Sequence, residues 1–156
     1  MSVALRLWAM LAVMALGLSA QKSNKPDFSG TWQLDLQRSR FGNVPPPKSL
    51  TIQIEHNEPQ IRIFTVTTNE TRETNETLEL TTDGKQHAYT LQGQTCAASA
   101  RWHWWRGQRL VVEVSCPENS RSRRFTLGAE GRMLTTVLTI RDRSVENKAY
   151  EFFFKR

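Results

Sequence analysis

The sequence predicts an all-β domain, an antiparallel up-and-down β-barrel of about ten short strands. From Gly30 onward, apolar and polar residues alternate with the period of two that is typical of half-buried strands. Turn-forming residues interrupt this alternation at short intervals, and no segment after the N-terminus has helical periodicity. Because parallel strands need long crossover connections, usually helical, the pattern excludes a parallel sheet. Among antiparallel folds it favours a barrel over a sandwich.

The N-terminal segment does not belong to this domain. Arg6 is its one charge, an apolar run extends from Leu7 to about Leu16, and small residues follow at Ser19 and Ala20. This order is typical of a secretory signal peptide, and the run is shorter than the roughly 20 residues of a membrane-spanning helix. We therefore expect residues 1–20 to be a signal peptide and residues 21–156 to form one β-barrel domain that is secreted or periplasmic.

The alternation predicts the strands in order along the chain. Their expected ranges are 30–35, 48–56, 59–68, 71–81, 85–92, 95–105, 108–116, 120–127, 132–141 and 147–155. Short connections such as Asp83-Gly84 and Glu130-Gly131 suit tight turns between antiparallel neighbours. The one longer connection, 37–47, contains Pro45-Pro46-Pro47, which favours an extended strap across one end of the barrel.

The two cysteines support this arrangement. With a turn near Arg106, Cys96 and Cys116 fall opposite each other on adjacent antiparallel strands, within bonding distance. An even pair in an exported chain favours a disulfide over free thiols, metal binding or catalysis.

The first strand carries a recognisable motif. Phe28-Ser29-Gly30-Thr31-Trp32 resembles the Phe-x-Gly-x-Trp opening of the calycin superfamily, which contains the lipocalins and the fatty-acid-binding proteins. The chain is similar to a secreted lipocalin-like domain, and its strand count and Lys148-Ala149-Tyr150-Glu151 resemble the fatty-acid-binding proteins. That resemblance implies a ligand carboxylate held by Tyr150, by Lys148 in place of the family's Arg, and by Arg123. Lys offers a point charge where Arg offers a planar two-pronged grip, and the family's two capping helices are missing.

Strand parity gives the residues expected inside the barrel. Ala98 and Ala100, flanked by Trp102 and Trp104, would leave space for a ligand cavity, although Met133 and phenylalanines could fill that space. An inward Arg123 must pair or bind a ligand, or else reach water at the barrel mouth. The expected ligand-binding residues are Trp32, Tyr89, Ala98, Ala100, Trp102, Trp104, Arg123, Lys148 and Tyr150. The expected partner is a small hydrophobic or amphipathic molecule, with a fatty acid as one example.

An alternative function uses the outer surface. Arg101, Trp105 and Arg106 form a basic and aromatic segment that could dock an anionic lipid, a polysaccharide or a protein partner, for example as an inhibitor. The chain has a net charge of +6, and Arg109, Arg121, Arg124 and Arg132 would extend a basic face. Export argues against nucleic acid as the partner.

Catalysis has little support in the sequence. His56, His87 and His103 lie on three different strands without metal-ligand spacing, and no nucleophile or phosphate-binding motif is present. We expect a monomer that binds without metal or cofactor and does not span a membrane. The Asn69 and Asn75 sequons are interpreted as chance matches.

Overall fold

The computed structural model describes residues 25–91, 93–104, 108–142 and 145–156, with the backbone alone described at 129, 142 and 145–149. The expected signal peptide and the Trp105-Arg106 pair lie outside the described residues. The described part contains ten strands and one short 3-10 turn, η1 (Ala129–Gly131). The strands are β1 (Gly30–Leu34), β2 (Ser49–Asn57), β3 (Gln60–Thr68), β4 (Glu73–Thr81), β5 (His87–Leu91), β6 (Gln94–His103), β7 (Arg109–Ser115), β8 (Asn119–Gly128), β9 (Met133–Asp142) and β10 (Val145–Lys155).

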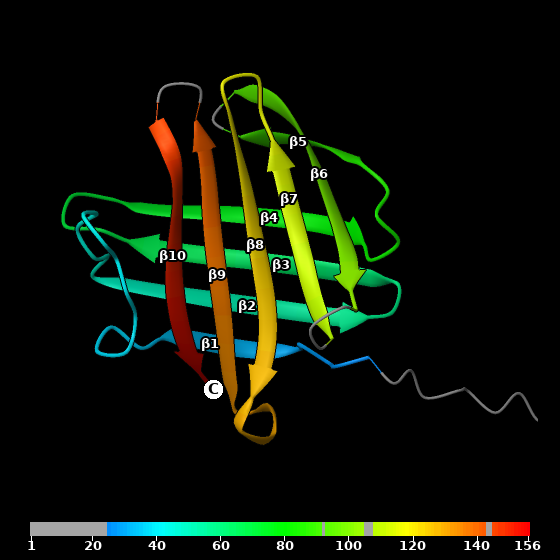
Figure 1. Ribbon diagram of the computed structural model, residues 1–156, viewed down its shortest axis with the longest axis horizontal. Coiled ribbons are helices and arrows are strands. Elements are labelled where there is room, and N and C mark those ends of the chain that lie inside the picture. The colour runs from blue at the N-terminus through cyan, green and yellow to red at the C-terminus, as the bar shows by residue number, and fades with distance from the viewer. Residues whose placement is uncertain (1–24, 92, 105–107, 143–144) are drawn as a thin grey trace, which may run out of the picture.

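All ten strands belong to one antiparallel sheet that curls into a nearly closed barrel (Figure 1). The order is β4-β3-β2-β1-β10-β9-β8-β7-β6-β5, so sequence neighbours pair and β1 joins β10. The edge strands β4 and β5 form no ladder with each other within the described part. Side chains bridge this seam instead: Tyr89 Oη donates to Glu76 Oε1 over 2.8 Å, and Thr81 Oγ1 lies 3.0 Å from His87 Nε2.

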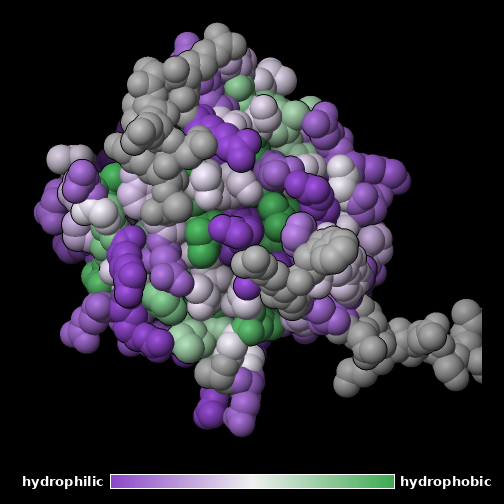
Figure 2. All heavy atoms as spheres, viewed as in Figure 1, coloured by the Kyte–Doolittle hydropathy of each residue, from purple (hydrophilic) through white to green (hydrophobic). Residues whose placement is uncertain are grey.

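The two halves of the sheet enclose the core. In Figure 1, β1–β4 run across the view, and β6–β10 cross them steeply in front. The largest side chains buried between the halves include Trp32, Phe28, Phe125 and Phe154. The side of β6–β10 that faces the viewer is mainly hydrophilic (Figure 2). Each strand therefore has one apolar and one polar face, as the alternation indicated.

The fold expected from the sequence is confirmed. Each expected strand is present with its ends shifted by two residues or fewer. The expected disulfide is also present: Cys96 and Cys116 are bonded, with their Cα atoms 4.4 Å apart. They extend the ladder in which Ala97 pairs with Ser115.

The strap between β1 and β2, residues 35–48, packs against β10. Arg40 N donates to Glu151 O over 2.8 Å, and the Phe41 and Phe152 rings lie 5.5 Å apart. At Gly42, φ is 56°, and a Cβ added there would lie 3.5 Å from the Tyr150 ring. The strap therefore covers the part of β10 that carries two inward aromatic residues.

Candidate ligand-binding site

The register places two of the expected anchors in one row of the inner face. Tyr150 on β10 pairs with Leu138 on β9, and Leu138 pairs with Arg123 on β8. With strands about 4.8 Å apart, the Cα atoms of Tyr150 and Arg123 are separated by roughly 10 Å. The third expected anchor, Lys148, pairs through its backbone with Ile140 in the next row, but its side chain is not described.

A polar cluster lies beside this row. Glu76 on β4 forms an ion pair with Arg121 on β8, and it accepts the hydrogen bond from Tyr89 on β5. Burial and, to a lesser extent, repulsion from Arg123 together lower the pKa of Arg121 to about 10. Burial also raises the pKa of Tyr89. Tyr89 was expected to contact the ligand, but its hydroxyl bonds to Glu76 and so connects the edge strands β4 and β5.

Arg123 differs from Arg121 because its guanidinium has no ion pair or hydrogen bond among the described residues. It lines the interior beside Phe125, Val112 and Leu138. Burial lowers the pKa of Arg123 to about 10, which reflects the cost of withdrawing its charge from water. In the adjacent row, the fully buried Thr136 presents a hydroxyl that also has no partner in the described part of the chain. The inner face of β8 and β9 therefore carries a cation and a hydroxyl group with unused hydrogen-bonding capacity.

The free space at this cluster is small. The interior cavity lined by Glu76, Arg121 and Arg123 has a volume of about 20 Å³. This is room for about one water molecule. Ala98 and Ala100 are 1% and 0% exposed, belong to the packed core and do not border this cavity. Both alanines share one buried cluster with Phe28, Leu110 and Phe125, which favours the packed alternative over an open cavity at this point.

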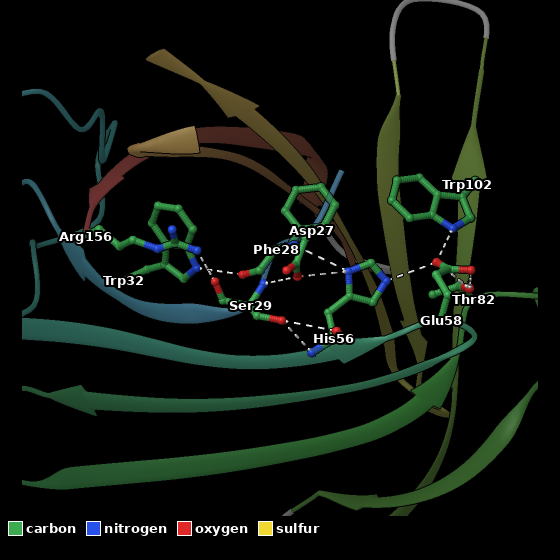
Figure 3. Close-up of polar contacts among 9 residues, drawn as sticks. All are labelled: Asp27, Phe28, Ser29, Trp32, His56, Glu58, Thr82, Trp102 and Arg156. Carbon is green, nitrogen blue, oxygen red and sulfur yellow. Dashed lines mark hydrogen bonds and ion pairs between the residues drawn. The ribbon is translucent and has the colours of Figure 1, made fainter. Parts of the chain in front are cut away.

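A second polar network is centred on Glu58, in the turn between β2 and β3 (Figure 3). Its carboxylate accepts hydrogen bonds from Trp102 Nε1 at 2.8 Å, His56 Nε2 at 3.0 Å and Thr82 Oγ1 at 3.0 Å. Lys25 Nζ lies 2.6 Å away from it. Partial burial raises the pKa of Glu58, but hydrogen bonds from Lys25, His56, Trp102 and Thr82 outweigh that effect and lower it to about 2.

Both ring nitrogens of His56 have partners: Nδ1 accepts a hydrogen bond from Phe28 N over 3.4 Å, and Nε2 lies against Glu58. His56 lies between Glu58 and Asp27, whose Oδ1 is 3.8 Å from Nδ1, and its side chain is 3% exposed. The Ser29 hydroxyl bonds to the backbone N and O of His56, not to its ring (Figure 3). Among the described residues, no hydroxyl or thiol is hydrogen-bonded to the imidazole ring. Within the described residues, no group of three His, Cys, Asp or Glu side chains could hold a metal ion.

The three tryptophans expected to line the ligand cavity lie in three different environments. Trp32 is fully buried, donates to Phe28 O over 2.9 Å and has the Arg156 guanidinium 4.8 Å from its ring. Trp102 lies half-buried in the Glu58 network, 5.9 Å from the Phe28 ring. The inward placement expected for Trp104 is wrong: it is 58% exposed and leans on Trp102 at 6.3 Å. Because β6 ends at His103, Trp104 lies at the rim, beyond the interior.

Two key carboxylates were not anticipated from the sequence. Glu58 sits in a turn segment and Glu76 in a Thr/Glu-rich strand, where acidic residues are ordinary surface residues. Parity alone could have indicated Glu76, because it shares a face of β4 with Leu78 and Leu80. Nothing in the local sequence distinguishes Glu58.

The nearly closed barrel of ten antiparallel strands is a calycin-type fold. Human cRBP IV matches with a TM-score of 0.52 and 15% identity, over 84% of this chain and 98% of that one. Secretory abundant heat soluble protein 4 from Ramazzottius varieornatus matches with a TM-score of 0.52 and 12% identity, over 83% and 94%. At these identities the likeness concerns the fold. No family model and no curated protein sequence matches the chain. The described residues include no helix that is both long and apolar enough for a membrane span.

Proposed function

We propose that this protein is exported and binds a small amphipathic molecule with an anionic head group inside the barrel, without catalysing a reaction. The observation that carries the proposal is the Arg123 guanidinium, which lines the interior without a counter-ion in the described part of the chain. A guanidinium partly withdrawn from water is stabilised by pairing with an anion, and the described residues supply no such anion, so an anionic head group entering here would gain this partner.

The surroundings of Arg123 suit the two parts of such a ligand. The Thr136 hydroxyl and the Tyr150 ring lie in the same region of the inner face, and Phe125, Val112 and Leu138 supply apolar contacts. The resemblance to the fatty-acid-binding proteins and the fold shared with human cRBP IV, a binding protein by its name, point the same way. Because the interior cavity is about 20 Å³, a ligand tail must displace side chains, and the strap over Tyr150 and Phe152 is the segment best placed to move.

The export part of the proposal rests on the signal-peptide pattern of residues 1–20 and on the disulfide. Cys96 and Cys116 are bonded, and disulfides persist mainly in oxidising compartments. Both observations support a secreted or periplasmic location.

The test is a titration of oxidised residues 21–156 with a fluorescent fatty acid and with the matched fatty alcohol. Saturable one-to-one binding that favours the acid is expected. Arg123→Met should weaken binding of the acid by at least about tenfold and leave binding of the alcohol within about twofold. Arg132→Met, which removes an exposed arginine, should change neither. Absent binding, or equal loss for acid and alcohol, would overturn the proposal.

A further inference from the structure

A second site lies on the opposite side of the sheet, on the outer face of β6–β9. A groove of about 620 Å³ runs over these four strands. Its volume is in the range of small-ligand sites, and its lining is rich in arginine, serine and threonine. Val114 and Arg121 also border the interior cavity, but the outward-facing arginines, serines and threonines of the groove do not line it, so the site is distinct from the one proposed above.

The register fixes the layout of the groove in rows across the strands. In one row Arg101 and Arg124 flank Val111. The next row holds Ser99, Glu113, Ser122 and Thr139, and the row beyond it holds Ser115, Ser120 and Arg141. On the other side of the first row, His103 pairs with Arg109. Two sets of guanidinium groups are thus separated by a band of hydroxyl groups.

The charge of this face is unbalanced. Among the described residues that line the groove, Glu113 is the one acidic residue, and it pairs with Arg101 at 3.3 Å. For Arg109, Arg124 and Arg141 the described residues supply no ion pair. The Arg109 Nε atom is buried without a hydrogen-bond partner in the part of the chain that the structure describes. Val111 points outward but is only 6% exposed, which indicates that the long side chains around it lie over the strand.

These features identify the chemistry of the partner. Guanidinium groups pair with carboxylates in a two-pronged geometry, and serine and threonine hydroxyls bond to sugar hydroxyls. Arg124 and Arg141 lie two rows apart, so their positions differ by about 13 Å along the strands. An acidic polysaccharide carries carboxylates along a chain of hydroxylated sugar rings, so it can place carboxylates at both arginines and sugar hydroxyls between them. Single-stranded nucleic acid needs aromatic platforms, and among the described lining residues only His103 is aromatic. A lipid surface would need exposed apolar side chains, and the one apolar residue at the centre, Val111, is covered.

We propose that the outer face of β6–β9 binds an acidic polysaccharide through Arg109, Arg124 and Arg141, with the Ser/Thr band contacting the sugar hydroxyls. This site develops the outer-surface alternative drawn from the sequence: Arg109 and Arg124 belong to the basic face expected there, and the structure adds Arg141.

The experiment measures binding of a galacturonic acid hexasaccharide to oxidised residues 21–156 by calorimetry. Arg109→Gln with Arg124→Gln should weaken binding at least about tenfold. The control pair, Arg62→Gln with Arg132→Gln, removes the same charge elsewhere and should stay within about twofold. Binding should weaken with added salt, and a glucose hexasaccharide should not bind.

Four outcomes would overturn the proposal. They are no binding of the acidic hexasaccharide, equal weakening in both double variants, equal binding of the neutral hexasaccharide, and tighter binding of an oligothymidylate. Arg123→Met should leave binding of the hexasaccharide unchanged. Failure of this site and failure of the interior site are therefore distinguishable.

Discussion

The indole Nε1 of Trp102 donates a hydrogen bond to Glu58 Oε1 over 2.8 Å, joining residues 44 positions apart. This contact ties β6 in one half of the barrel to the turn between β2 and β3 in the other. The same carboxylate accepts hydrogen bonds from His56 and Thr82 and forms an ion pair with Lys25. One acidic group therefore links four segments: the N-terminal segment, the end of β2 with its turn, the segment after β4, and β6.

Glu58→Gln should therefore destabilise the fold at neutral pH by about 2 kcal/mol, because a neutral amide cannot pair with Lys25 and accepts weaker hydrogen bonds. Chemical denaturation at pH 7 measures this loss. Glu118→Gln, an exposed acid in the β7–β8 turn, is the matched control and should change little.

The same residue predicts a pH dependence. The pKa of Glu58 is held at about 2, below its usual 4.5, so its contribution is complete above pH 4.5 and is lost as the pH falls towards 2. The unfolding free energy of the wild type should fall more steeply over this interval than that of Glu58→Gln. Parallel curves for the two proteins would contradict the assignment.

The two inner arginines should respond in opposite directions to the same substitution. Arg123→Met removes an unpaired charge and should raise the unfolding free energy by about 1 kcal/mol. Arg121→Met leaves the partly buried Glu76 without its cation and should lower the unfolding free energy by about 2 kcal/mol. Thermal unfolding of both variants measures the two changes in stability. Destabilisation by Arg123→Met would contradict the prediction and show that the Arg123 guanidinium has a structural partner.

The packed interior makes a prediction at Ala100, which is fully buried. Ala100→Leu should cost about 2 kcal/mol through overpacking, whereas Ala88→Leu on the exposed side of β5 should be nearly neutral. Urea unfolding compares the two. A neutral or stabilising Ala100→Leu would mean that space exists beside this residue.

The disulfide closes a loop with a sequence separation of 20 residues. Replacing both cysteines with serine should lower the unfolding free energy by about 3 kcal/mol on the chain-entropy model. Reductant should produce a similar loss in the wild type and none in the double serine variant. An unchanged midpoint for the reduced wild type would count against the predicted contribution.

The comparison of sequence and structure separates local from non-local information. The strand ends, the inward parity of Leu110, Val112 and Val114, and the Cys96–Cys116 pairing all follow from alternation and from tight turns. Both signals lie within neighbouring stretches of chain, so the sequence by itself determined the all-β class, the hairpin register and the position of the disulfide.

Only the tertiary structure decided the chemistry of the site. Glu76 meets Arg121, and Glu58 meets Trp102, because closing and twisting the sheet brings distant strands into contact. The same closure leaves Arg123 without an ion pair among the described residues, fills the space beside Ala100 and places Trp104 at the rim. Parity states which face a side chain occupies. What it meets there depends on the curvature of the barrel and on the volume of the side chains opposite.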